Sequence, residues 1–198
     1  MIDAALGSEL LDAVRGTDPW DAAVHLALGI GLRREEVLGL RWEDVDDAVH
    51  VRQTVTAADG LIHFGPPKST AGRRDIPLPD FVSRALQRHR VAQAEQLLAL
   101  GVRPELVVAD AIGQPLQPAS FSGAWRDFAN AHGFDVTFHG LRHGAATLLL
   151  AAGVSDTVAM RTMGHADTRI LARYQDVVSE LQRDAAVRMD RLLEEGKG

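Results

Sequence analysis

Hydrophobic side chains recur with the period of an α-helix over most of the chain. Residues 8–15 read as a short helix, and residues 20–30 form a segment that is apolar on most sides and is therefore expected to be buried. Residues 80–100 and 120–131 each combine an apolar face with a polar one, which is typical of helices that cover a core. The pattern predicts a protein built mainly from helices.

Between residues 48 and 78 the hydrophobic period changes to that of strands. Three short strands are predicted, with turns at Asp59-Gly60 and across residues 68–72: AVHVRQTV, LIHF and RDIPLP. We expect them to form one small three-stranded antiparallel sheet. Together with the helices, this sheet defines an α+β fold that is mainly α-helical.

The C-terminal third returns to the helical period. One apolar helix is expected over residues 139–152, a second is capped by Ser155, and a third is capped by Asp167. The pattern over residues 177–198 predicts an amphipathic C-terminal helix followed by a tail. Residues 1–7 are expected to be an N-terminal tail or linker remnant.

Length and composition fit a single domain over residues 1–198. The chain is 46% hydrophobic and has no internal repeat or linker, so it is expected to bury one core. It contains no cysteine, which excludes disulfides, thiolate nucleophiles and cysteine-bound metal centres. No apolar run reaches the roughly 18 residues that a membrane span requires, and the N-terminus has no signal-peptide pattern. We therefore expect a cytoplasmic protein without a membrane partner.

The net charge of −6 is unevenly distributed. Residues 1–62 carry five basic and twelve acidic side chains, whereas residues 63–93 carry six basic and two acidic ones. Residues 139–174 are also net positive. Since a phosphate responds to charge within about 8–10 Å, the local sign matters more than the total. These clusters are either ordinary solvated faces or DNA-binding surfaces, and the candidate DNA contacts are Arg73, Arg74, Arg161, Arg169 and Arg173.

Candidate catalytic residues follow one another in a distinctive order. A His-x-x-Arg motif alone is expected about once by chance in a chain this rich in both residues, so it carries little information. Here it is preceded by a glycine turn with an arginine and a hairpin lysine, and followed by a Gly-His pair and the only tyrosine. The six residues are Arg33, Lys68, His139, Arg142, His165 and Tyr174.

From about residue 8 to residue 180 the sequence resembles the tyrosine recombinase (phage integrase) family. Four segments resemble its successive catalytic boxes: GLRREEVLGLRWEDVD, PKSTAGRRDIPL, FHGLRHGAATLLLAAG and MGHADTRILARYQDV. The resemblance implies the catalytic-domain fold of that family. It places Arg33 and Arg142 as the catalytic arginines, Lys68 as the hairpin lysine, His139 and His165 as the two histidines, Tyr174 as the nucleophile and Glu36 as an acidic brace. Gly144 departs from the family, which often has threonine there.

The chemistry of these residue types suits such roles. A phenol with a pKa of about 10 is only about a thousandth phenolate at pH 7, so nearby positive charge must assist Tyr174. Two arginines can hold the scissile phosphate and stabilise its transition state, and a lysine can protonate the departing 5′-oxygen. The expected product is a 3′-phosphotyrosyl bond, and the resemblance implies no cofactor, metal or ATP.

Other interpretations remain open. Each residue alone has an ordinary structural role; Arg33, for example, could pair with Glu36. His139, His143 and His165 could form a three-histidine metal site, although the glutamate of a His-Glu-x-x-His motif is absent. The same chemistry is also used in type I topoisomerase-like DNA relaxation, and the fold could serve as a DNA-binding module that does not cleave.

The expected partners are double-stranded DNA and further recombinase protomers, in a tetramer by resemblance. The helix at residues 177–194 could dock on a neighbouring protomer or on its own core. Family members carry an N-terminal DNA-clamping domain, for which there is no room before residue 8, so we expect an isolated catalytic domain whose weak DNA affinity falls steeply with salt.

Overall fold

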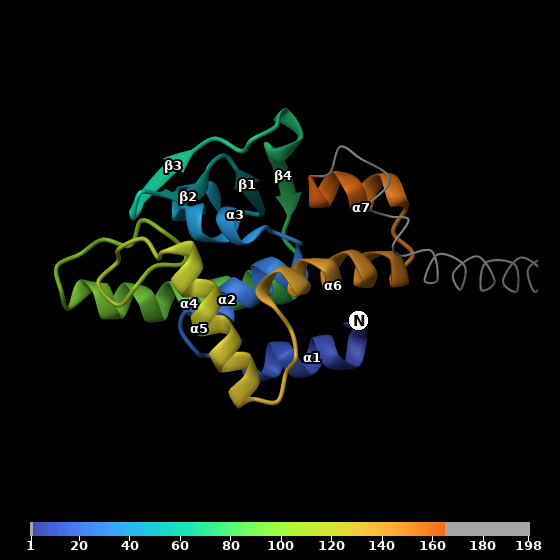
Figure 1. Ribbon diagram of the computed structural model, residues 1–198, viewed down its shortest axis with the longest axis horizontal. Coiled ribbons are helices and arrows are strands. Elements are labelled where there is room, and N and C mark those ends of the chain that lie inside the picture. Colours follow the sequence, from blue (N-terminus) through green and yellow to red (C-terminus); the bar gives the residue numbers. More distant parts are fainter. Residues whose placement is uncertain (1, 165–198) are drawn as a thin grey trace, which may run out of the picture.

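The computed structural model describes residues 2–164. Four strands and two small 3₁₀ turns occupy residues 42–77, and helices lie before and after them (Figure 1). In chain order the elements are α1 (Ala4–Ala13), α2 (Trp20–Val24), the π-helix η1 (His25–Gly29), α3 (Arg34–Gly39), the 3₁₀ turn η2 (Trp42–Asp44), β1 (Ala48–Val51), β2 (Thr54–Ala58), β3 (Leu61–Gly65), the 3₁₀ turn η3 (Thr70–Gly72), β4 (Arg74–Pro77), α4 (Asp80–Leu98), α5 (Pro118–Ala131), α6 (Phe138–Ala151) and α7 (Asp156–Met163).

The N-terminal helix begins earlier than predicted. The carboxylate of Asp3 accepts a hydrogen bond of 2.9 Å from the backbone amide of Leu6 and so caps α1. Ile2 is buried, and its side chain lies where a Cβ at position 144 would be, 2.8 Å from Ile2 Cδ1. The prediction of a tail over residues 1–7 is therefore wrong from residue 2 onward, and Gly144 provides the room for this contact.

The segment predicted to be a buried helix forms the centre of the molecule. From Trp20 to Leu28 every residue is buried, and the helix continues from α2 into the π-helix η1. Helices α4 and α6 pack against it, and Trp20 contacts the rings of Phe121 and Trp125 at centroid distances of 5.0 and 5.4 Å. This core fixes the position of α3, which follows η1 after the short connection of residues 30–33.

The prediction of a single three-stranded sheet is wrong. The described residues form two separate two-stranded antiparallel sheets, β1 with β4 and β2 with β3. The segment expected as one strand breaks between β1 and β2, where Gln53 leaves the ladder and its side-chain amide donates to the carbonyl of Gly39 at 2.8 Å. The predicted turn is present in the β2–β3 hairpin, where Asp59 and Gly60 both have positive φ.

The later helices lie close to their predicted positions. Between α4 and α5, residues 106–109 are buried, and Leu106 forms an isolated antiparallel β-bridge with Arg41. Helix α7 lies beside β4 and α6 (Figure 1) and rests on a small cluster separate from the main core. The helices predicted after Asp167 and over residues 177–194 lie outside the described residues. Between residues 2 and 164, no helix combines the length and apolar character needed to cross a membrane.

Candidate active site

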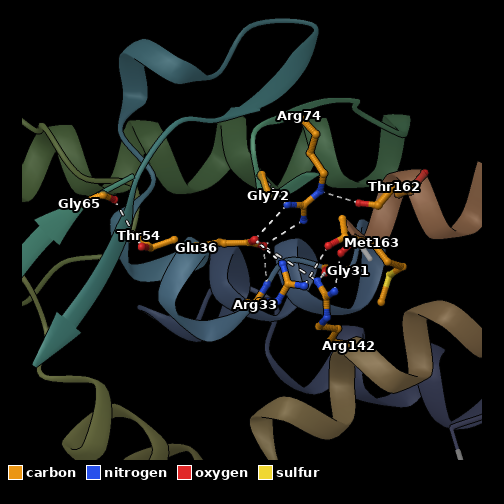
Figure 2. Close-up of polar contacts among 11 residues, drawn as sticks. Gly31, Arg33, Glu36, Thr54, Gly65, Gly72, Arg74, Arg142, Thr162 and Met163 are labelled. Carbon is orange, nitrogen blue, oxygen red and sulfur yellow. Dashed lines mark hydrogen bonds and ion pairs between the residues drawn. The ribbon is translucent and has the colours of Figure 1, made fainter. Parts of the chain in front are cut away.

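The buried carboxylate of Glu36 organises the site. It accepts hydrogen bonds from the backbone amide of Arg33 at 2.8 Å and from its guanidinium at 2.9 Å. It also receives two parallel bonds from Arg74, each of 2.9 Å (Figure 2). Burial alone raises the pKa of Glu36, but the hydrogen bonds and positive charge of Arg74, together with those of Arg33, lower that pKa overall. Glu36 is therefore an ionised anchor for arginines.

The two arginines that the sequence singled out both lie near this carboxylate, on the side away from Arg74 (Figure 2). Arg142, from α6, is only 2% exposed and places Nη1 4.0 Å from Oε2 of Glu36. It also donates to the carbonyls of Gly31 and Met163, while Arg33 donates to the carbonyl of Gly164 at 3.0 Å. Residues more than 100 positions apart are thus brought into one cationic cluster (Figure 2).

A glycine turn brings the chain from the core into this cluster. Gly31 has a φ of +71°, and a Cβ at this position would overlap with Sδ of Met163. The chain then becomes extended at Arg33, which is the N-cap residue of α3, so that its amide and its side chain both face Glu36. The predicted turn into a short helix is confirmed, and it aims Arg33 at the site.

Helix α6 also carries His139, three residues before Arg142. The hydroxyl of Thr137 caps the helix by accepting from the amide of Gly140 at 3.0 Å. Partial burial, followed by the nearby His143 and Arg142, lowers the pKa of His139, so its ring is mainly neutral near pH 7. Such a ring can accept a proton. It lines a groove of about 560 Å³ between α5 and α6.

Lys68 lies in the connection between β3 and β4. Its exposed side chain lines a groove of about 690 Å³ that also contains Arg33, Glu36 and residues of β2. Lysine and arginine therefore face the same groove from different parts of the chain. This is the placement that a shared phosphate site requires.

The prediction that Arg74 contacts DNA is wrong. Its guanidinium is buried and donates to Glu36, to the carbonyl of Gly72 at 3.0 Å and to the carbonyl of Thr162 at 2.7 Å. Burial alternates along β4, so Arg74 faces inward together with Ile76. The alternation of inward and outward positions along β4 could have been predicted from the sequence, and it would have placed Arg74 on the inward face together with Ile76. Arg73 and Arg161 are exposed, as a DNA contact requires.

Four predicted site residues lie outside the described part of the chain: His165, Tyr174, Arg169 and Arg173. The chain leaves α7 at Gly164, which has a φ of +61° and directly precedes His165. The metal alternative also needs His165. Among residues 2–164, the rings of His139 and His143 lie edge to face at 4.7 Å, and no three acidic or histidine side chains converge on one point.

The fold is that of a tyrosine recombinase catalytic domain. Its arrangement matches the integrase of the Tn1549 transposon, solved in complex with transposon right end DNA, with a TM-score of 0.74 over 93% of this chain and 65% of that one, at 21% identity. Residues 8–180 match the model of the phage integrase family. The chain belongs to this family.

Two curated relatives illustrate the similarity. The integrase of Mycobacterium phage D29 is 27% identical over 197 residues, covering 95% of this chain and 52% of that protein. A XerC-like tyrosine recombinase of Caldanaerobacter subterraneus subsp. tengcongensis is 27% identical over 181 residues, covering 82% of this chain and 46% of that protein. The chain thus spans about half the length of the curated relatives it matches.

Proposed function

We propose that this chain is the catalytic domain of a site-specific DNA recombinase that cleaves and rejoins double-stranded DNA through a covalent 3′-phosphotyrosine on Tyr174. The observation that carries the proposal is the convergence of Arg33 and Arg142 on Glu36, beside a groove that Lys68 also lines. Membership of the phage integrase family supports DNA as the substrate.

In the proposed reaction the scissile phosphate binds beside Arg33, whose side chain is 34% exposed and opens onto the groove. Arg142 is buried next to the same carboxylate and adds positive charge from the protein interior. Both guanidinium groups are permanently charged, and an anion in such a site gains preorganised hydrogen bonds as negative charge develops on the phosphorus oxygens. Loss of one such donor costs about 3–4 kcal/mol of transition-state stabilisation.

Proton transfers complete the mechanism. Neutral His139 accepts the proton of the Tyr174 phenol, which otherwise faces a penalty of about 4 kcal/mol for ionisation at pH 7. Lys68 donates a proton to the departing 5′-oxygen, and His165 donates a hydrogen bond to the phosphate. The phosphotyrosyl bond conserves the energy of the broken bond, so rejoining needs no ATP, and the arginines supply the charge that a metal would otherwise supply.

Recombination joins two duplexes, so it requires several protomers. We propose that this domain acts as part of a tetramer on DNA, with residues 177–194 docking either on a neighbouring protomer or on their own core. Arg73 and Arg161 are exposed and would contact the DNA backbone.

The test uses nicked duplexes with randomised sequence around the nick, so that the target site need not be known beforehand. The nick lets the short cleaved strand diffuse away, which traps the covalent intermediate. An SDS-resistant protein–DNA adduct is expected with the wild-type chain and is lost in Tyr174→Phe. No adduct would refute cleavage and leave a DNA-binding module; an adduct that persists in Tyr174→Phe would refute the nucleophile.

A second assay separates recombination from simple relaxation. The selected site is placed on a supercoiled plasmid and on a linear duplex, and the products are resolved on a gel. Joining of the two molecules supports a recombinase. Relaxed plasmid without joint molecules, at enzyme concentrations that saturate adduct formation, would favour a type I topoisomerase-like activity.

A further inference from the structure

Three arginines hold the last turn of α7, each through a different carbonyl. Arg74 donates to Thr162, Arg142 to Met163 and Arg33 to Gly164 (Figure 2). The carbonyls at a helix C-terminus have no partner within the helix and carry the negative end of its dipole. Cations at three successive carbonyls therefore satisfy these groups and fix the helix end against the site.

Arg74 connects three segments of the site through direct hydrogen bonds. Both of its Nη atoms bind the Glu36 carboxylate, Nη1 also binds the carbonyl of Gly72, and Nε binds the carbonyl of Thr162. Through Glu36 it supports Arg33. Gly72 lies four residues after Lys68, and Thr162 lies three residues before His165.

The fit around this guanidinium is close. A Cβ at Gly164 would lie 2.8 Å from Nη1 of Arg74, so only glycine allows this approach. The apolar support of α7 is small by comparison: its buried contributions are Ala159 and Met163, which pack on Ala145, Ala146 and Leu150 of α6. The position of the helix end therefore depends strongly on its polar contacts.

We propose that Arg74 is a positioning residue, which couples the Glu36–Arg33 pair, the Lys68 connection and the end of α7 from which the chain continues to His165 and Tyr174. This inference rests on the proposed function of the site. Arg74 is only 8% exposed and acts without touching DNA. Its planar fork can make all these bonds at once, whereas a lysine ammonium can keep the charge opposite Glu36 but not the geometry.

The test compares Arg74→Lys and Arg74→Gln with the wild type, using the trapping duplex selected above. Single-turnover adduct formation at saturating DNA is expected to fall on the order of 10–100-fold, since displacement of reacting groups by about 1 Å has effects of this size. The DNA dissociation constant and its salt dependence stay within about twofold. Arg74→Lys should retain more activity than Arg74→Gln. Rates are normalised to the folded fraction measured by circular dichroism.

Arg88→Gln is the matched control, because Arg88 also contacts a buried carboxylate, Asp21 at 3.3 Å, but lies on α4 and lines neither groove of the site. It should destabilise the protein without slowing cleavage per folded molecule. Equal cleavage rates in wild type and both Arg74 variants would overturn the proposal. So would a parallel loss of DNA affinity with a smaller salt dependence, which would make Arg74 a DNA contact. Failure of both Arg74 variants to fold under conditions where Arg88→Gln folds would assign it a purely structural role.

A readout without DNA separates this inference from the proposed function. In the free protein, Arg74→Gln should accelerate hydrogen exchange of the backbone amides at residues 156–164 by at least about tenfold relative to those of α6, whereas Arg88→Gln should not. If the wild type forms no adduct, the proposed function fails, and the exchange measurement alone decides whether Arg74 anchors α7. Unchanged exchange would overturn the coupling.

Discussion

Replacing Glu36 by glutamine removes one negative charge from a buried pocket and leaves its shape almost unchanged. Four hydrogen bonds of 2.8–2.9 Å converge on this carboxylate, two from Arg33 and two from Arg74. Glutamine presents one acceptor oxygen and an NH₂ group that can only donate. Two of the four N–H groups that now donate to Glu36 would therefore face the NH₂ group of glutamine, which is itself a donor.

The cost is set by the charges that remain. Arg74 and Arg142 are 8% and 2% exposed, and Glu36 is the carboxylate within 4.0 Å of each among the described residues. Removing one partner of a buried ion pair costs about 3–5 kcal/mol, because the remaining charge stays desolvated. Since domains of this size are stable by only about 5–15 kcal/mol, we expect Glu36→Gln to lose a third or more of the free energy of unfolding.

Urea denaturation followed by tryptophan fluorescence measures this loss, and its pH dependence tests the cause. The folded-state pKa of Glu36 lies below the ordinary value of 4.5, so its contribution is fully present above about pH 4.5 and is lost as the pH falls through the folded-state value. The difference between wild type and Glu36→Gln should therefore be constant near neutral pH and shrink below about pH 4.5.

Glu35→Gln provides the control, since it changes the same residue type one position earlier. Glu35 is 35% exposed and pairs with Arg34 at 2.6 Å, and such a partly exposed pair contributes about 0–1 kcal/mol. Two results would contradict an ionised, buried Glu36: a loss of less than about 1 kcal/mol of unfolding free energy in Glu36→Gln near pH 7, or a difference in unfolding free energy between the two variants that does not change in acid.

Four further predictions concern chemistry, DNA affinity and packing. The cleavage rate should fall only below about pH 6.5, following the lowered pKa of His139, and this inflection should vanish in His139→Gln; an inflection above pH 6.5 would contradict the assignment. Lys68→Ala should slow cleavage by about 10²–10⁴-fold on ordinary DNA but far less on a 5′-bridging phosphorothiolate, whose thiolate leaves without a proton; equal losses on both substrates would exclude the lysine as the acid. DNA affinity, measured by fluorescence anisotropy, should fall steeply between low and high salt, and comparable affinities would count against backbone binding. Gly31→Ala should destabilise the fold by about 1–3 kcal/mol, because its Cβ overlaps Met163; an unchanged urea midpoint would show that the helix end yields freely.

Local pattern in the sequence predicted much of the helical structure. The buried segment at residues 20–30 and the amphipathic helices α4 and α5 were recognisable because their periodicity reflects burial on a known face. The break at Gln53 was not predictable, since its cause is a hydrogen bond to Gly39, 14 residues away. The early start of α1 was missed, although Asp3 is a good N-cap residue.

The candidate active site, too, could be predicted only in part. The order of motifs predicted that Arg33 and Arg142 would meet, and the structure brings both to Glu36. Periodicity could not have shown this, because nothing local links positions 33 and 142; the resemblance to a family supplied it. Arg74 was misassigned because its charge was counted without asking which face of β4 it occupies. Nothing in the sequence indicated that the last carbonyls of α7 accept hydrogen bonds from three arginines, because every residue carries the same backbone carbonyl.

The Glu36–Arg74 pair also bears on how such a domain can be engineered. Replacing a buried ion pair by apolar side chains of similar volume is often neutral or stabilising by about 1–4 kcal/mol. Here that exchange should destabilise the protein, because Glu36→Leu/Arg74→Met would take the Glu36 carboxylate away from Arg142, which is 2% exposed and lies 4.0 Å from it. A stabilisation campaign on this domain should therefore leave this cluster unchanged and substitute residues elsewhere.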